Sequence, residues 1–195
     1  MPRPDVIVVG AGTTGSVVAA RLSEDPRRAV LVLEAGPGGR PGGGLDPFAA
    51  LAEPGRVWPE LTARRAAGQA PEPYWQGRGL GGSSAVNGMV AVWGSTADYD
   101  RWGVSGWSSA ELAPARARVD AMLPGQPVVR TGPVNRALGR AATTRGLVVE
   151  PVRATTSGAD RLSVADAYLG RIGARPNLTI RTDAAVMRDA QPPIP

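Results

Sequence analysis

The feature that most constrains this chain is the glycine pattern G-x-G-x-x-G at residues 10–15, which reads GAGTTG. It follows a short apolar run at residues 5–9 and precedes a stretch rich in good helix formers at residues 13–24. A second apolar run occupies residues 29–33. Strand, glycine turn, helix and strand in this order predict a parallel βαβ unit over residues 5–34. Continuous Val-rich runs are typical of strands covered on both faces of a sheet.

The glycine turn has a chemical meaning that follows from backbone geometry. Gly10 permits a tight turn, Gly12 lets the backbone approach a pyrophosphate, and Gly15 lets the helix pack closely on the strand. The helix N-terminus then offers unpaired N–H groups and a positive dipole end to phosphates. Glu34 closes the second strand roughly 20 residues later, where a carboxylate accepts hydrogen bonds from a ribose diol and repels a 2′-phosphate. The pattern predicts a dinucleotide site that favours FAD or NAD over NADP.

A second glycine cluster lies in the segment GRGLGGSSAVNGMVAVWGSTADYD at residues 77–100. It resembles the first signature of the glucose-methanol-choline (GMC) oxidoreductases in its Gly77-Arg78 pair, its Gly-Gly-Ser-Ser run at 81–84, Asn87 and Asp100. Glycines here let backbone N–H groups crowd a large anionic ligand, and Ser83 and Ser84 can add hydroxyl donors or cap the next helix. A single nucleotide needs only one such loop, whereas FAD has both a pyrophosphate and a flavin ring to place. Further segments resemble the family at residues 98–108, 161–169 and 175–186.

The resemblance implies an α/β fold with a Rossmann-like FAD/NAD(P)-binding domain and a parallel sheet, incomplete in this chain, plus the beginning of a substrate domain. It implies that Thr13 and Thr14 lie near the pyrophosphate, that residues 87–89 run beside the flavin, and that Val186 touches the adenine through its backbone. Ordinary core packing is an equal alternative for Met89. The predicted FAD-binding residues are Gly10, Gly12, Thr13, Thr14, Gly15, Glu34, Ala35, Arg78, Gly82, Ser83, Asn87, Gly88, Met89 and Val186.

The chemistry implied by the family is oxidation of a small alcohol with hydride transfer to the flavin, assisted by a histidine base near the carboxyl terminus. This sequence contains neither histidine nor cysteine, so no catalytic residue and no metal ligand is assigned. The ending DAQPPIP at residues 189–195 does not continue a flavoprotein fold, and we expect a truncation, a frameshift product or one piece of a split gene whose partner is the carboxyl-terminal half. The chain alone is expected to be inactive. Two alternatives stay open, a non-catalytic flavin-binding remnant or subunit and, less favoured, an NAD-dependent dehydrogenase.

Composition narrows the remaining functions. The net charge of +5 comes from 22 basic residues that are all arginine, but they are spread along the chain, whereas a nucleic-acid binder concentrates them in a stripe. No apolar run approaches the ~18 residues of a membrane span, and no signal peptide is indicated. We therefore expect a cytoplasmic protein that binds no nucleic acid. The five tryptophans are interpreted as packing residues.

Other elements follow from local patterns. Residues 108–111 have the spacing of a capping box and predict a helix from 109 to about 122, with Pro114 disturbing its early part. A further helix is expected over 133–146, with Gly146 just past its end. The short strands predicted are at residues 74–76, 147–152 and 177–182.

Overall fold

The structure is a computed structural model that describes residues 3–128, 132–172 and 175–187. The chain divides into two compact units, one made of residues 1–88 and 159–195 and the other of residues 89–158. The prediction that residues 189–195 do not continue a flavoprotein fold concerns residues outside the described part of the chain.

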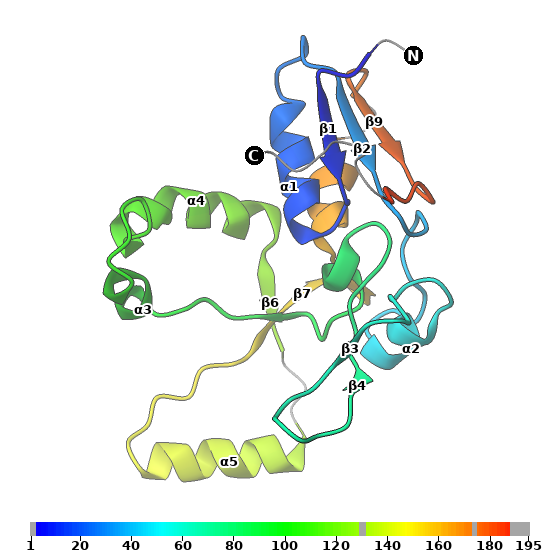
Figure 1. Ribbon diagram of the computed structural model, residues 1–195. Coiled ribbons are helices and arrows are strands. Elements are labelled where there is room, and N and C mark those ends of the chain that lie inside the picture. Colours follow the sequence, from blue (N-terminus) through cyan, green and yellow to red (C-terminus); the bar gives the residue numbers. More distant parts are fainter. Residues whose placement is uncertain (1–2, 129–131, 173–174, 188–195) are drawn as a thin grey trace. The chain divides into compact units, whose positions relative to one another are not determined.

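The first unit is built on a parallel three-stranded sheet (Figure 1). Strand β1 (Val6–Val9) pairs with β2 (Val30–Leu33), and β2 pairs on its other side with β9 (Leu178–Arg181). Helix α1 (Thr13–Leu22) connects β1 to β2. The predicted βαβ unit is therefore confirmed, although α1 ends two residues before the predicted end.

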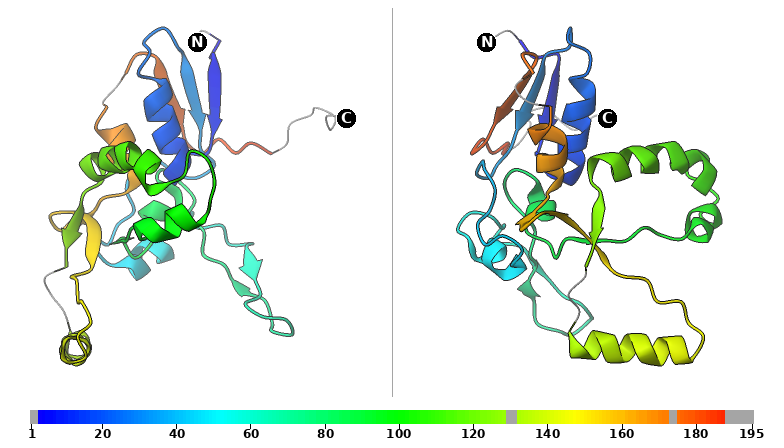
Figure 2. Two further views of the ribbon diagram at one scale, coloured as in Figure 1. Left: turned by 90° about the vertical axis from the view of Figure 1, so that its left-hand side faces the viewer. Right: turned by 180° about the vertical axis from the view of Figure 1, so that it is seen from behind.

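Helix α1 packs on one face of the sheet, as the two views in Figure 2 show. Val8 of β1 is buried and faces α1, because a Cβ on Gly15 of the helix would lie 3.5 Å from its Cγ1 atom. Ile7 and Val9 point to the opposite face, since side chains alternate along a strand, and they are 54% and 64% exposed. The expectation that β1 is covered on both faces is therefore wrong for this chain.

The carboxyl end of α1 is held by the Arg-Pro-Asn stretch that precedes β9. Nη1 of Arg175 donates to the carbonyl of Ala20 at 2.7 Å and to Oγ of Ser23 at 2.9 Å. The Asn177 amide donates to three carbonyls of the turn between α1 and β2. A basic side chain at a helix C-terminus also complements the helix dipole. These bonds fix the turn that leads into β2. They thereby help to position Glu34, the residue that follows β2.

The rest of the first unit consists of short elements between long loops. They are α2 (Pro47–Ala52), the antiparallel pair β3 (Thr62–Ala63) and β4 (Glu72–Pro73), the 3-10 turn η1 (Gly82–Ala85), β8 (Asp160–Arg161) and the π-helical turn η2 (Asp166–Gly170). The strand predicted at 74–76 is misplaced. β4 ends at Pro73. Beyond it, Tyr74 N donates to Leu61 O, and Val57 and Gly77 form an isolated antiparallel bridge in which Trp58 N donates to Gln76 O, so residues 74–76 form no strand.

The second unit contains an antiparallel sheet of β5 (Val90–Ala91), β7 (Arg153–Ser157) and β6 (Gly125–Pro127), in the order β5-β7-β6, and the helices α3 (Thr96–Arg101), α4 (Ser109–Met122) and α5 (Pro133–Thr144). The capping box predicted for α4 is present between Ser108 and Glu111, and the helix runs continuously through Pro114. Asp100 accepts hydrogen bonds from the backbone N–H and hydroxyl of Ser109 at 2.8 and 3.0 Å. The acidic residue of the signature therefore joins α3 to the start of α4.

Two further predictions in the second unit have opposite outcomes. Helix α5 ends as expected: Gly146 has φ +73° and donates to Thr143 O, while Leu147 N donates to Ala142 O, which is a Schellman motif. The strand predicted at 147–152 is wrong, because the sheet uses residues 153–157 instead. Pro151 has no N–H to donate, and Val148 is 88% exposed, so the apolar run alone does not pair.

Candidate functional site

The turn between β1 and α1 has the geometry that its three glycines predict. Gly10 adopts φ +88°, and its N–H donates to Leu33 O at 2.7 Å. A Cβ on Gly15 would lie 1.9 Å from Gly10 O, so helix and strand approach too closely for a side chain there. Gly12, in contrast, has φ −71°, and a Cβ built on it would meet nothing nearer than Gly82 Cα at 3.9 Å. The protein itself leaves room at Gly12 that it does not leave at Gly15.

The N-terminus of α1 is suited to an anion. Its N-cap is Gly12, which has no side chain to cap the helix, and the first turn contains no acidic residue. The first intrahelical bond is donated by Ser16 N to Gly12 O at 2.9 Å, so the N–H groups of Thr13, Thr14 and Gly15 precede the regular ladder. Backbone donors at the positive end of a helix dipole are the donor set that a pyrophosphate requires.

The second glycine segment lies directly against this turn. Gly81 N donates to Ala11 O at 2.8 Å, and a Cβ on Gly82 would come within 2.8 Å of Gly12 Cα. The segment is tight within itself as well, because Ser83 Oγ accepts from Gly77 N at 3.0 Å. The structure therefore brings the two glycine segments of the first unit together, as one extended ligand contacting both would require.

Glu34 joins the two segments. The residue is 5% exposed, and its Oε2 accepts from Ala11 N at 2.7 Å. Its Oε1 accepts from Gly36 N at 2.8 Å and from Gly79 N at 2.9 Å. A carboxylate offers about four acceptor positions, and these backbone donors occupy three of them. The sequence predicted the ribose-facing role of Glu34 but not this structural one.

Arg78 reinforces the same junction. Its Nη2 donates to Ala35 O at 2.7 Å, and its guanidinium lies 5.3 Å from the ring centre of Trp58. Its backbone N–H donates to Arg56 O at 2.7 Å. Arg56 is 4% exposed and binds Glu53 through Nε at 2.9 Å. Glu53 also accepts from Gly42 N, and this backbone donor together with Arg56 lowers the pKa of Glu53 from its ordinary value. The predicted site residue Arg78 is thus hydrogen-bonded to Arg56, which belongs to an ion pair with Glu53 that the sequence patterns did not predict.

The remaining predicted residues are less closely tied to the glycine turns. The backbone carbonyl of Asn87 accepts from Arg161 Nη1 at 2.6 Å. Met89 is buried, has φ +62° and begins the second unit. Val186 is 49% exposed and follows residue 184, whose N–H donates to Glu34 O at 2.9 Å. The proposed contacts of these residues with a cofactor stay predictions.

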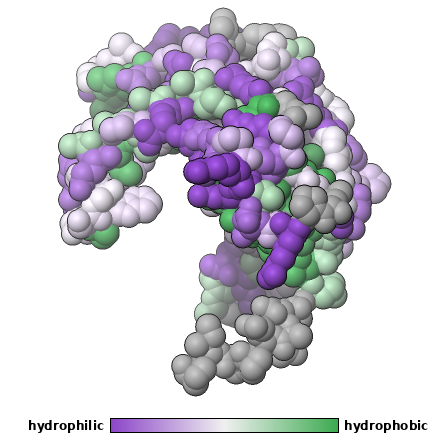
Figure 3. All heavy atoms as spheres, turned by 90° about the horizontal axis from the view of Figure 1, so that it is seen from above, coloured by the Kyte–Doolittle hydropathy of each residue, from purple (hydrophilic) through white to green (hydrophobic). Residues whose placement is uncertain are grey.

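Two other kinds of site are absent from residues 3–128, 132–172 and 175–187. No cluster there has three or more acidic side chains arranged to hold a metal ion. No helix in that part is long and apolar enough to cross a membrane. On the face drawn in Figure 3, hydrophilic residues are interspersed with apolar ones.

Comparison with known proteins identifies the family. The sequence model of the GMC oxidoreductases matches residues 4–189, and the chain belongs to this family. An oxygen-dependent choline dehydrogenase of Klebsiella pneumoniae is 35% identical over 223 aligned positions that cover 92% of this chain and 39% of the relative. A choline dehydrogenase of the same description from Sinorhizobium fredii is 39% identical over 135 positions, 60% of this chain and 23% of its own length.

Solved structures give the same fold. Pyridoxine 4-oxidase from Mesorbium loti superposes with a TM-score of 0.78 and 29% identity, over 93% of this chain and 42% of its own. An FAD-dependent oxidoreductase from Chaetomium thermophilum gives a TM-score of 0.71 at 25% identity, over 92% and 38%. The chain thus spans about two fifths of the length of relatives that it matches over nearly its whole extent.

Proposed function

We propose that this chain forms the FAD-binding part of an oxidoreductase that oxidises the CH–OH group of a small alcohol. The observation that carries the proposal is the junction at Glu34, where one buried carboxylate binds Ala11 of the first glycine segment and Gly79 of the second. Family membership supports it, because the relatives include choline dehydrogenases and an FAD-dependent oxidoreductase. A cytoplasmic location is part of the same proposal.

The residues at this junction fit FAD. The N–H groups of residues 13–15 would receive the pyrophosphate, and the carboxylate of Glu34 would receive a ribose hydroxyl. The segment 82–88 would extend along the rest of the cofactor. When bound, FAD supplies the ring that accepts a hydride from the alcohol carbon. The contribution of this chain is to bind and orient that group and to present backbone donors to its charges.

Binding can be tested with a pair of matched variants. Gly12→Ala leaves the protein unstrained, since the backbone is in an allowed region and the nearest atom is 3.9 Å from the new Cβ. The methyl group would instead occupy space that a pyrophosphate needs. We expect the purified chain to bind FAD. Gly12→Ala should weaken this binding by about tenfold or more, because a displaced pyrophosphate would lose at least one hydrogen bond from a backbone N–H group. Gly139→Ala in α5 is the control, as its new Cβ has 3.9 Å of space.

Flavin fluorescence and absorbance after gel filtration measure the retained cofactor, and circular dichroism confirms that each variant is folded. A folded wild-type chain that binds no FAD would contradict the proposal. Equal FAD affinity of Gly12→Ala and wild type would contradict the pyrophosphate role of this turn. NAD is titrated in parallel, because tighter binding of NAD than of FAD favours the alternative of a nicotinamide-dependent dehydrogenase.

Catalysis is expected to require more than this chain. It contains no histidine, and a positioned general base contributes roughly 10²- to 10⁴-fold to rate. We therefore expect no bleaching of the flavin band when the FAD-loaded chain is mixed anaerobically with choline, primary alcohols or sugars. Bleaching at about 1 s⁻¹ or faster would show that the chain carries its own catalytic groups. Activity restored by a histidine-containing carboxyl-terminal half would identify a split enzyme, and no activity with it a flavin-binding remnant.

A further inference from the structure

Strand β1 lies at an edge of the three-stranded sheet, and its outer side pairs with no strand of the described residues (Figure 2). The N–H groups of Val6 and Gly10 donate to backbone carbonyls at the two ends of β2, at 3.2 and 2.7 Å. In a parallel pair every second residue turns its backbone groups toward the partner strand. Ile7 and Val9 therefore turn their N–H and C=O groups outward, where they form an unused set of donors and acceptors.

The same two residues expose their side chains. Ile7 is 54% and Val9 is 64% exposed, on the sheet face opposite α1. Every residue of β1 is valine or isoleucine, so the strand contains neither a charged residue nor a proline. Charged side chains and prolines are the usual means by which edge strands avoid pairing with another chain. Because β1 has neither, its outer edge is suited to accept a further strand.

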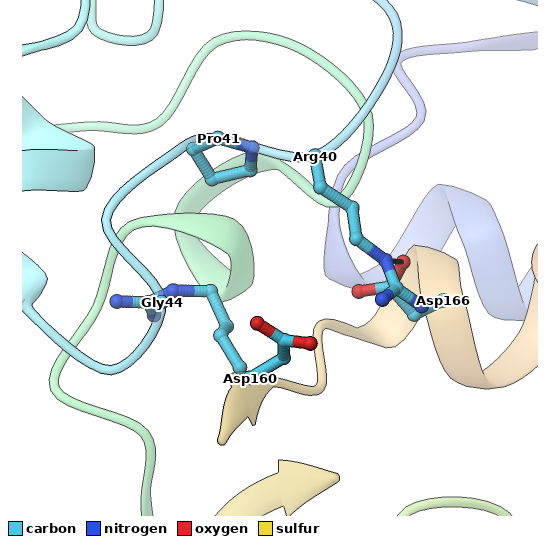
Figure 4. A pocket seen from close by; sticks show the side chains of 6 residues that line it. Arg40, Pro41, Gly44, Asp160 and Asp166 are labelled. Atoms are coloured by element: carbon cyan, nitrogen blue, oxygen red, sulfur yellow. Dashed lines mark hydrogen bonds and ion pairs between the residues drawn. The ribbon is translucent and has the colours of Figure 1, made fainter. Parts of the chain in front are cut away.

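Other open features of the first unit lack this combination. The opposite edge strand, β9, ends in Arg181, and a charged side chain on an edge opposes pairing. The polar cavity shown in Figure 4 measures about 30 Å³, and its Asp166 carboxylate is already bound by Arg40 Nε at 2.6 Å and by the Ser163 hydroxyl at 2.7 Å. The edge of β1 instead exposes backbone donors, backbone acceptors and apolar side chains together.

We propose that two copies of this chain associate through β1, with the strands antiparallel and Val8 of one copy opposite Val8 of the other. In this register Ile7 faces Val9 of the second copy, and each such pair exchanges both of its backbone hydrogen bonds. The paired side chains lie on the same face with Cβ atoms about 5 Å apart, so they form one apolar cluster over the seam. The contact is self-complementary, as a two-fold interface must be. It does not depend on the function proposed above.

The dimer should be weak. A contact made by one four-residue strand falls below the roughly 1,200 Å² of a stable interface. No charged residue lies within β1, so like charges do not meet along the seam, but each chain carries a net charge of +5. Salt screens the resulting repulsion. Association should therefore become measurable between about 0.1 and 1 mM protein, and it should strengthen when NaCl is raised from about 0.05 to 0.5 M.

Two measurements on the 195-residue chain, without FAD, test the proposal. Sedimentation velocity over this concentration range measures the monomer–dimer equilibrium. Amide exchange followed by NMR locates the contact, because the N–H groups of Ile7 and Val9 should exchange about twofold or more slowly at high concentration than at low. Val6 and Gly10 already donate to carbonyls at β2, so their exchange rates serve as the internal reference and should not change.

A pair of variants tests the register. Ile7→Lys and Val9→Glu each place a charge against an aliphatic side chain of the second copy, and each alone should weaken dimerisation about tenfold. In an equimolar mixture the new ammonium and carboxylate groups lie opposite each other, so the mixed dimer should regain about the wild-type affinity. Phe48→Lys is the matched control, since Phe48 lies in α2 and is 78% exposed; it should leave dimerisation unchanged. Circular dichroism confirms that each variant is folded.

Three results would overturn the proposal. The first is a chain that stays monomeric at about 1 mM in both salt concentrations. The second is a dimer in which Ile7 and Val9 exchange as in the monomer, or a variant mixture that associates no better than either variant alone, because the contact then lies elsewhere. The third is protection of these two amides by a separately expressed carboxyl-terminal part of the Klebsiella pneumoniae choline dehydrogenase but not by a second copy, which would assign the edge to that part.

Discussion

Replacing Gly15 with alanine tests how closely α1 packs on the first glycine turn. The new Cβ would lie 1.9 Å from Gly10 O and 3.0 Å from Gly10 C, so the backbones must separate by roughly 1 Å or more to reach an ordinary contact. The obstructing atoms belong to the backbone, and no side-chain rotation relieves them. Overpacking of this kind costs about 1–3 kcal/mol, and we expect the upper end. Alanine regains about 1 kcal/mol of helix propensity over glycine, which leaves a net destabilisation of about 2 kcal/mol.

For a chain of this size that loss lowers the melting temperature by about 4–8 °C. Thermal and urea unfolding followed by circular dichroism measure it in the absence of any cofactor. Gly139→Ala is the control, because it makes the same change inside a helix where the nearest atom is 3.9 Å away; it should raise stability by up to about 1 kcal/mol. If Gly15→Ala melts at or above the wild-type temperature, the close approach of α1 to Gly10 is not what requires glycine at this position.

Two more predictions concern buried or bound carboxylates. Glu34→Gln should destabilise the cofactor-free chain by about 2–4 kcal/mol, measured by urea unfolding, because an amide oxygen cannot serve the three N–H donors that the carboxylate binds; an unchanged midpoint would refute the structural role of Glu34. Gly42 N–H and Arg56 lower the pKa of Glu53, so its contribution is present above the unfolded pKa of about 4.3 and is lost as pH falls through the lower folded value. The melting temperature should therefore fall with pH below about 4.3 less steeply in Glu53→Gln than in wild type, and identical slopes would contradict this.

The parts of the fold that could be predicted are those specified by neighbouring residues. The capping box at Ser108 and the helix end at Gly146 each depend on a pattern within a few residues, and the βαβ unit depends on successive local patterns within residues 5–34. The sheet of the second unit could not be predicted in this way. Its central strand β7 has the sequence RATTS and pairs with β5 more than 60 residues away in the chain, so its position is decided by long-range pairing and not by local hydrophobicity.

The candidate site shows the same division. The roles of Gly10 and Gly15 follow from their spacing, and the structure places both as expected. The bonds from Ala11 and Gly79 to Glu34 cross 23 and 45 positions of sequence, and that from Arg161 to Asn87 crosses 74. A single sequence carries no signal for such pairs. The strand predicted from the apolar run at 147–152 was wrong for a related reason, because an apolar segment forms a strand only where another strand pairs with it.

The hydrogen bonds at Glu34 matter for ligand binding because they link the two glycine segments to each other. Ala11 donates to Glu34 and accepts from Gly81, while Gly79 donates to the same carboxylate. These bonds form a closed circuit between the two glycine segments. The N-terminus of α1 and the carboxylate of Glu34 are therefore held in a fixed arrangement by these hydrogen bonds. Because little backbone remains to be ordered on binding, the entropy lost there is small, and the affinity for FAD should respond to the shape of Gly12 more than to the stability of the chain.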